Sequence, residues 1–523
     1  MKDKTTTIYK NAILNKATDV LQIFIKYIIV IISMLFLGFI FLQSFFGSTF
    51  LDFCESSFFI EKPFWSTVLI VLIPILIAII VKIILQKYSI SIVTPNYIFL
   101  GIVTVVYTIL MIMFVYKTGI PAMDDQELIL NAANDLLNNV PDMWDKGAYC
   151  YRFPNQNGFI LFVALGLKMF GADNQMVFQY LNIPMLILSS FFLSKTIYLL
   201  FNDKKLARYS YILLLGFFQL NCYVTFVYGT LYGLAASVAG IFLLIKYFKK
   251  RNIVNGLVGI SLLSIGYGFK SNYLIMIVAA CLLLLFDAIV KKSLKSVISL
   301  VWGIVFYVVV VTSISSTIYH LTGKKVDEGT PNTAWVAMGL QESYKAPGWW
   351  NGYNAKVFAD NEYDIPKTKE AISQNISERM EELKKDKDYT MSFFSRKTAS
   401  QWSEGTFECF YITNLDRGRL SNPTWTDSVK NLMVDGHSAN RAVTTICNYF
   451  IVFLWLGIIL FLIFDFRKLD AYKLIFAITF IGGFLFHLVW EAKGQYTIIY
   501  AYLMIPYMLR GYQLLLRRVC NIS

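Results

Sequence analysis

Long apolar runs alternate with short polar segments along most of the chain. A helix of roughly 20 apolar residues is long enough to cross about 30 Å of hydrocarbon. The pattern therefore predicts about twelve membrane-spanning helices. Their approximate bounds are 24–46, 64–85, 97–116, 176–201, 209–226, 229–247, 254–269, 271–290, 296–318, 443–464, 473–491 and 496–516.

Two longer polar stretches interrupt this pattern. In 117–175, Leu128–Leu137 predicts an amphipathic helix on the membrane surface, and Phe159–Phe170 is apolar but too short to cross. The second stretch contains charges of both signs and several prolines, as a small ordered domain would. These features predict an N-terminal transmembrane module (1–318) with an outer loop (117–175), an extracytoplasmic loop domain (319–440) and a C-terminal transmembrane module (441–523).

Composition identifies the class of protein. Of the 523 residues, 56% are hydrophobic and only 15% are charged, whereas soluble domains carry about 25% charged residues. Ten-residue segments of alternating polarity, typical of porins, are absent from the sequence, so helices must satisfy the backbone groups in lipid. We therefore expect an all-α polytopic membrane protein with outer juxtamembrane helices and a small extracytoplasmic insert.

The distribution of charge predicts the orientation in the membrane. The formal net charge is +13, but the basic residues occur in short clusters between apolar runs, for example 204–208 and 249–251. Cytoplasmic loops show this pattern, and nucleic-acid binding does not explain it. Both termini are therefore expected on the cytoplasmic side of the cytoplasmic membrane. The polar stretches 117–175 and 319–440 are expected outside, as is a short acidic loop that contains Asp52 and Glu55.

Asp124 and Asp125 follow the third predicted span directly and are the first candidates for chemistry. One interpretation is a solvated loop with acids at a helix N-terminus, a placement favourable by roughly 0.3–1 kcal/mol. The other is a general base that deprotonates an acceptor hydroxyl. Glu127 is a further acid on the same segment and a candidate substrate contact.

The segment Tyr151–Gly158 combines turn formers with polar side chains. Pro154 and Gly158 interrupt regular structure, which is consistent with a simple cap and turn before a surface helix. Sugar recognition is the alternative, because each amide presents both a donor and an acceptor. The candidate substrate-binding residues here are Arg152, Asn155, Gln156 and Asn157.

A second candidate segment lies outside between the last two predicted spans. Charged residues so close to hydrocarbon are expensive and often functional, although a turn whose long side chains reach toward water is the plainer interpretation. Lys493 could pair with a phosphate as a point charge. The other candidates for substrate binding in this segment are Glu491, Gln495 and Tyr496.

Three more residues are candidates by position or by type. Lys270 lies between two spans whose other ends are cytoplasmic, so it is expected outside, against the positive-inside trend. A cation placed there is a candidate partner for an anionic ligand. Trp349 and Trp350 in the insert could stack on sugar faces, or they could pack the core of a small domain.

Several common catalytic patterns are absent from the sequence. There is no GxxxxGK[ST], no HExxH and no GxSxG, which argues against ATP-driven transport and against zinc or serine hydrolysis. The seven cysteines are dispersed without a CxxC pair, which argues against a metal cluster or a disulfide framework.

Together these motifs resemble the glycosyltransferase C superfamily, and most closely its protein O-mannosyltransferase and aminoarabinose transferase branch (glycosyltransferase family 39-like). Asp124-Asp125 stands in the acidic position, Phe153-Pro154 leads the proline segment, and Glu491–Tyr496 fills the late motif. Two departures are that the second acid is aspartate instead of glutamate, and that Lys493 and Gln495 stand where arginines are common. The chain looks most like members from low-GC Gram-positive bacteria.

The resemblance implies a glycosyltransferase C fold and an inverting sugar transfer at the outer face of the cytoplasmic membrane. The donor would be a polyprenyl-phosphate-linked sugar and the acceptor a hydroxyl of a cell-envelope polymer, lipid or protein. Asp125 or Asp124 would be the base, with the donor phosphate near Lys493 and Lys270. Some members use a divalent metal, Mg or Mn, at the acidic loop, whereas two adjacent acids alone favour a site without metal.

Other functions remain as alternatives. A transporter or flippase for lipid-linked saccharides would be expected to carry ionisable groups near mid-membrane and internal repeats. The sequence shows few such charges, and its polar residues gather on one outer side, which favours an enzyme. A ligase or polymerase of lipid-linked saccharides would share the outer site and the lipid donor.

Overall fold

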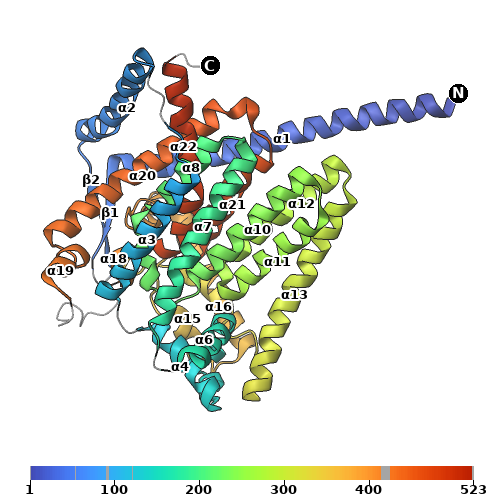
Figure 1. Ribbon diagram of the computed structural model, residues 1–523. Coiled ribbons are helices and arrows are strands. Elements are labelled where there is room, and N and C mark those ends of the chain that lie inside the picture. Colours follow the sequence, from blue (N-terminus) through green and yellow to red (C-terminus); the bar gives the residue numbers. More distant parts are fainter. Residues whose placement is uncertain are drawn as a thin grey trace.

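The computed structural model describes residues 2–52, 55–89, 93–119, 122–172, 174–413 and 425–520, with side chains from residue 18 onward. Helices dominate, as the apolar runs predict (Figure 1). Nine helices in the described ranges are long and apolar enough to cross a membrane. They lie in α1 (Lys2–Phe46), α2 (Phe64–Lys87), α3 (Tyr97–Thr118), α7 (Val177–Phe201), α10 (Thr230–Lys250), α12 (Leu274–Lys291), α13 (Leu294–Thr322), α20 (Ser438–Phe464) and α21 (Ile475–Val489). The chain is thus a mainly helical integral membrane protein.

Two further predicted spans form helices that do not meet the same criteria. Helix α11 (Ile253–Phe269) is apolar but contains only 17 residues. Helix α22 (Gly494–Val519) has 26 residues but is less apolar, because tyrosines and arginines are spread along it. Both pack against membrane helices, α11 against α10 and α13, and α22 against α20.

The predicted span 209–226 is not one continuous helix. The structure divides this part of the chain into α8 (Lys204–Leu215), α9 (Phe218–Cys222) and η3 (Tyr223–Thr225). The side-chain amide of Asn221 donates to the carbonyl oxygen of Leu215 at 2.8 Å. This bond satisfies a carbonyl that a continuing helix would have satisfied with its own backbone N–H.

Both helices predicted within 117–175 are present in the structure. The amphipathic segment forms α4 (Asp125–Asn138), and the short apolar segment forms α6 (Asn157–Phe170). Ile129 and Leu130 lie on the buried face of α4. Figure 1 shows α4 and α6 at the same end of the molecule as α15 and α16. In the chain, α4 and α6 are separated by η1 (Asp142–Trp144), α5 (Tyr149–Arg152) and η2 (Pro154–Gln156).

The polar insert folds into short helices that pack on the bundle. The longest helix among its described residues is α16 (Ile365–Lys385). The other helices are α14 (Thr333–Gly339), α15 (Tyr353–Asp360), α17 (Lys387–Trp402), α18 (Cys409–Thr413) and α19 (Asp427–Met433). Short 3₁₀ turns occupy Ser271–Tyr273 (η4), Phe466–Lys468 (η6) and Tyr472–Leu474 (η7).

The end of α17 is buried among the helices of the C-terminal membrane module. The Trp402 ring lies 5.3 Å from Phe480 on α21 and 5.8 Å from Tyr500 on α22, measured between centroids. It also lies 6.3 Å from Trp455 on α20. Edge-to-face and tilted contacts at these distances are favourable for aromatic rings, so the insert is anchored in the core of the bundle.

A two-stranded hairpin connects the first two membrane helices. Strands β1 (Gly47–Leu51) and β2 (Ser57–Glu61) pair antiparallel, with Gly47 opposite Glu61 and Leu51 opposite Ser57. The hairpin contacts the insert on both sides. The backbone N–H of Ser57 donates to the carbonyl oxygen of Lys345 at 2.7 Å, and Thr49 forms a parallel bridge with Glu404.

Glycine pairs allow α10 and α11 to approach closely. A Cβ added at Gly240 would lie 2.6 Å from the carbonyl oxygen of Gly259, and one added at Gly266 would lie 3.0 Å from that of Gly233. Small residues at helix crossings are typical of membrane proteins, because close packing stabilises association where lipid provides no hydrophobic drive.

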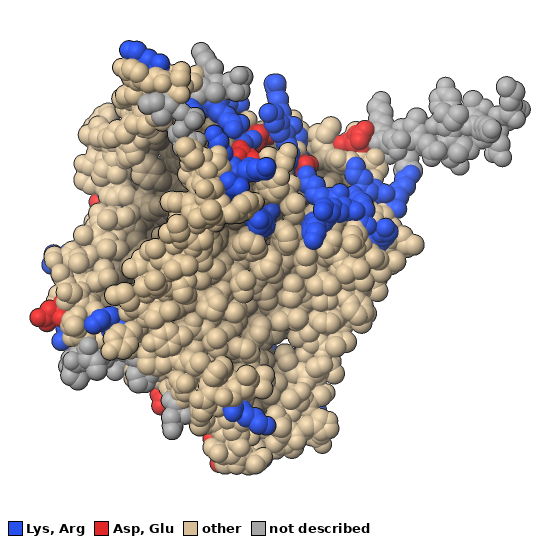
Figure 2. Space-filling model, in the orientation of Figure 1, with Lys and Arg blue, Asp and Glu red and all other residues tan. Residues whose placement is uncertain are grey.

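Lysine and arginine are unevenly distributed on the face of the molecule drawn in Figure 2. Figure 2 shows lysine and arginine gathered mainly toward the end that carries the C-terminus, away from α4 and α6. At that end Arg510 lies 3.0 Å from Asp465 and 3.7 Å from Asp203. These ion pairs join the start of α8 to the ends of α20 and α22.

Replacing Gly240 by alanine should separate α10 from α11. We expect the free energy of unfolding to fall by about 1–3 kcal/mol, the usual cost of overpacking a core. Gly101→Ala in α3 is the matched control, because nothing lies within 4 Å of a Cβ there. Thermal unfolding of the detergent-solubilised protein compares the two variants, and equal midpoints would contradict a tight contact at Gly240.

Candidate functional site

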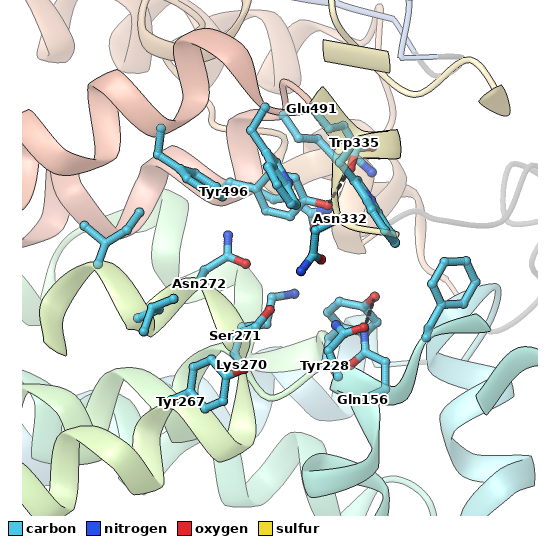
Figure 3. Close-up of a pocket in the computed structure, with 18 of the residues that line it drawn as sticks. Gln156, Tyr228, Tyr267, Lys270, Ser271, Asn272, Asn332, Trp335, Glu491 and Tyr496 are labelled. Carbon is cyan, nitrogen blue, oxygen red and sulfur yellow. Dashed lines mark hydrogen bonds between the residues drawn. The ribbon is translucent and has the colours of Figure 1, made fainter. Parts of the chain in front are cut away.

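A cavity of about 1320 Å³ lies between the segments around α4, the insert and the membrane helices. Its polar end contains side chains from α4, from the turns that precede α12 and α22, and from the insert. Figure 3 shows Gln156, Tyr228 and Lys270 on one side of this opening. Glu491 and Tyr496 lie on the other side, so charged groups face one another across the cavity.

Most of the remaining cavity wall is apolar, and four membrane helices contribute the main part of it. These are α1, α12, α13 and α21. The wall residues are Ile28, Ile29, Ile32, Ile275, Val278, Ala279, Leu282, Val311, Ile314, Ile478, Ile481 and Leu485. One continuous cavity therefore joins a charged end to an apolar region among the spans.

Asp125 is the first residue of α4, and two neighbours fix its position. The Tyr228 hydroxyl donates to Asp125 Oδ2 at 3.0 Å, and the Gln156 amide donates to the same hydroxyl at 2.6 Å. Gln126 holds the adjacent turn, because its side-chain oxygen accepts from the Val227 N–H at 2.7 Å. The carboxylate of Asp125 is thus oriented at the polar end of the cavity.

Lys270 lies beside this chain of hydrogen bonds. Its ammonium group is 3.7 Å from the centroid of the Tyr228 ring and 5.8 Å from that of Tyr496, within the range of cation–π attraction. Burial lowers the pKa of Lys270 to about 7; Lys493 adds to this effect, whereas Asp125 and Glu491 oppose it. The charge of Lys270 therefore changes near neutral pH.

Lys493 precedes α22 and has two acidic partners. Its ammonium nitrogen lies 2.9 Å from Glu55 Oε1 and 3.9 Å from Glu408 Oε2. Burial lowers the pKa of Lys493, but Glu408, nearby tyrosines and Glu491 raise it more strongly, so this pKa lies above its ordinary value. Lys493 remains a cation at neutral pH.

Glu408 and Glu491 are buried carboxyl groups near Lys493; Glu491 lines the cavity and Glu408 does not. Glu408 accepts from the N–H groups of Gly494 and Gln495 at the start of α22, at 2.5 and 3.3 Å. Burial raises the pKa of Glu408 to about 7 despite Lys493. Burial also raises the pKa of Glu491, whose Oε2 accepts from the Tyr496 hydroxyl at 3.3 Å. The negative charge near Lys493 is therefore reduced when the pH falls below about 7.

The structure brings most of the predicted site residues together. Eleven of them line the cavity: Asp124, Asp125, Arg152, Asn155, Gln156, Lys270, Trp350, Glu491, Lys493, Gln495 and Tyr496. Three others are not in its lining. Glu127 is exposed on α4, Asn157 accepts from the Trp144 indole at 3.1 Å, and Trp349 is buried with its indole donating to Ser400 at 2.8 Å.

Sequence reasoning missed several residues at this end of the cavity. Tyr228 orients Asp125, and its position beside a glycine at an outer turn was a weak signal. Glu55 and Lys345 also line the cavity and form an ion pair. Their positions in separate polar loops gave no sign that they meet. Glu408 lies within a segment whose polar composition suggested only a solvated domain.

Lys397 connects the ends of α14 and α21 near the cavity. This fully buried ammonium donates to the carbonyl oxygens of Gly339 at 2.5 Å and Trp490 at 2.8 Å. These carbonyls end α14 and α21, where a cation is favoured by the helix dipole. The rings of Trp335 and Trp490 stack with centroids 5.9 Å apart and both line the cavity.

The donor atoms present do not form an evident metal centre. Within the described ranges, no group of three or more His, Cys, Asp or Glu side chains is arranged to hold a metal ion. Cys54, which is expected outside, falls beyond the described residues. The basic side chains that line the cavity are those of Arg152, Lys270, Lys345 and Lys493.

A comparison with protein-family models finds a match over most of the chain. A family model described as "conserved hypothetical integral membrane protein" matches residues 24–515, a range that includes every residue placed in the cavity lining above. Neither the curated proteins nor the solved structures contain a significant match. Since the family model covers nearly the whole chain, the protein belongs to this family of conserved hypothetical integral membrane proteins.

Proposed function

We propose that this protein is a membrane glycosyltransferase that moves a sugar from a polyprenyl-phosphate donor to an acceptor hydroxyl of the cell envelope. The observation that carries the proposal is the single cavity in which Asp125, Lys270 and Lys493 share a polar end with an apolar wall from four membrane helices. A lipid-linked sugar has this same division between a charged, polar head and a long apolar tail.

The proposed fold is that of the glycosyltransferase C superfamily, with about twelve membrane crossings. Counting α11, α22 and the broken segment α8–η3 together with the nine apolar helices gives this number. The proposed orientation places the basic end in the cytoplasm, because Lys and Arg accumulate in cytoplasmic loops. The cavity's polar end then lies outside the cytoplasmic membrane, where sugar nucleotides are absent and a lipid carrier supplies the sugar.

In the proposed reaction, Asp125 takes the proton of the acceptor hydroxyl. The acceptor oxygen forms a bond to the anomeric carbon of the sugar while the bond from that carbon to the phosphate oxygen breaks. The electron pair leaves with the polyprenyl phosphate, and the configuration at carbon inverts. Lys493 and Lys270 stabilise the negative charge that develops on the leaving phosphate, and Tyr228 holds the base in its orientation.

The remaining lining residues have supporting roles in this proposal. Arg152, Asn155 and Gln156 offer hydrogen-bond donors to the sugar, and Trp350 offers an aromatic face. A transporter or flippase, or a ligase or polymerase of lipid-linked saccharides, would use a similar cavity. The enzyme proposal differs from transport because it requires a base at Asp125.

Asp125→Asn should abolish transfer while leaving expression and membrane insertion intact. The amide keeps the shape of the side chain and an oxygen that can accept from Tyr228, but it cannot remove the acceptor proton. We expect a loss of about a hundredfold or more, the usual contribution of a general base. The measurement is incorporation of labelled sugar from a polyprenyl-phosphate donor into membranes of cells that carry only the variant.

Two further variants complete this test. Glu127→Gln removes an acid of the same helix that lies outside the cavity lining and should leave transfer unchanged. Asp124→Asn tests the neighbouring acid. Full activity in both Asp124→Asn and Asp125→Asn would refute the base assignment.

Comparing the sugars on wall polymer, lipoteichoic acid and surface protein, with and without the gene, identifies the sugar and the acceptor.

Binding of the donor should weaken as the pH rises through about 7. The Lys270 ammonium loses its proton in this range, because its pKa is lowered, and the buried Glu408 carboxyl gains negative charge. We expect affinity to fall about five- to tenfold from pH 6 to pH 8, the loss of one charge-assisted hydrogen bond. Methyl farnesyl phosphate is the probe, since a phosphodiester keeps one negative charge across this range.

Lys270→Arg is the control for this pH dependence. Arginine stays protonated in proteins, so the variant should show a shallower fall in affinity, with the remaining slope due to Glu408. An equally steep fall in Lys270→Arg would contradict the role given to Lys270. Equilibrium binding of the labelled probe to the purified protein measures both.

A further inference from the structure

Glu55 places a buried carboxylate between two lysines that line the cavity. The side chain of Glu55 is only 1% exposed. One oxygen, Oε1, lies 2.9 Å from the Lys493 ammonium, and the other, Oε2, pairs with Lys345. All three residues belong to the cavity wall, so the ion pairs stand within the space proposed for the substrate.

The two lysines come from segments that are far apart in the sequence. Lys345 belongs to the loop between α14 and α15, and Lys493 precedes α22. Their side chains are 11% and 20% exposed. Two mostly buried ammonium groups would repel each other without an anion between them. Their convergence on one carboxylate therefore defines a site whose geometry and charge suit an anion with two oxygens.

A phosphate has the same arrangement of acceptors and stronger charge. Two of its non-bridging oxygens can each pair with one ammonium group, as the two oxygens of Glu55 do here, and charge-assisted hydrogen bonds to phosphate are strong. Lys493 retains Glu408 at 3.9 Å as a second counter-ion. It therefore remains paired whether Glu55 or a phosphate occupies the other position.

Glu55 stands on a segment that could release its carboxylate. It follows β1 and precedes β2, and its backbone has φ of 60°, a left-handed conformation that non-glycine residues seldom adopt. Phe58, Phe59 and Ile60 of β2 are about half exposed, so the hairpin is not packed on all sides. Movement of this side chain does not require a membrane helix to move.

We infer that Lys345 and Lys493 together form the binding site for the donor's phosphate, and that Glu55 occupies this site as an internal anion until the donor displaces it. This inference rests on the proposed function and adds Lys345 as a phosphate-binding residue. It also assigns a role to the hairpin: Glu55 keeps the two lysines charged and positioned when the cavity holds no lipid.

Binding of farnesyl monophosphate and of farnesol to the full-length purified protein tests the inference. The two probes differ only in the phosphate. We expect Lys345→Gln to weaken binding of farnesyl monophosphate about tenfold, the value of one charge-assisted hydrogen bond, without changing that of farnesol. Glu55→Gln removes the competing anion and should strengthen binding of farnesyl monophosphate about tenfold.

Glu342 and Arg396 supply matched controls. They form an ion pair of 2.7 Å in the insert, and neither residue lines the cavity. Glu342→Gln and Arg396→Gln should leave both affinities unchanged. Glu55→Asp covers the case in which Glu55→Gln does not fold. The shorter side chain keeps its charge but cannot reach both lysines equally, so a smaller gain in affinity is expected.

The outcomes separate this inference from the proposed function. If Glu55→Gln, or Glu55→Asp in its place, leaves the affinity unchanged or lowers it, Glu55 is not a competing anion. An unchanged affinity in Lys345→Gln removes that lysine from the phosphate site. If Lys270→Gln alone weakens binding of the phosphate, the inference fails and the proposed function stands. If the wild-type protein binds farnesyl monophosphate no better than farnesol, both fail.

Discussion

Buried charge at the edge of the membrane is the constraint on which the candidate site depends. A buried lysine is costly unless anions and hydrogen bonds compensate its lost hydration, and Lys493 meets this requirement with Glu55 and Glu408. Those partners come from the first hairpin and from the segment after α17. The ion pairs therefore hold the first and last parts of the chain against the same cavity wall. The apolar helices provide the scaffold, and these pairs fix where its polar end can lie.

Much of this fold could be predicted from the sequence, because lipid imposes a simple rule on length and polarity. Runs of about 20 apolar residues gave correct positions for nine helices, and the short segment 159–170 was correctly separated from them as α6. The continuous span 209–226 was wrong. There the Asn221 side chain takes the place of a backbone donor, and hydropathy does not register such a local hydrogen bond.

Residues of the candidate site could be predicted only where the local sequence was unusual by itself, without knowledge of distant contacts. Asp125 and Lys493 stood out because acids and lysines beside an apolar run are unusual, and both line the cavity. Trp349 did not follow its neighbour Trp350 into the lining, since the choice between them depends on packing against α17. Neither Glu55 nor Lys345 could be predicted as a site residue, because their ion pair joins positions that are 290 residues apart in the sequence.

The bond pattern of Lys397 has a mechanical consequence. The Lys397 ammonium group donates to carbonyl oxygens at the C-terminal ends of both α14 and α21. The stacked rings of Trp335 and Trp490 join the same two helices. Helix α21 contributes part of the apolar wall, whereas Trp335 of α14 stands at the polar opening. The apolar wall and the polar opening therefore share one set of buried contacts. A lipid chain that moved α21 would strain these contacts, and through them the position of Trp335 at the opening.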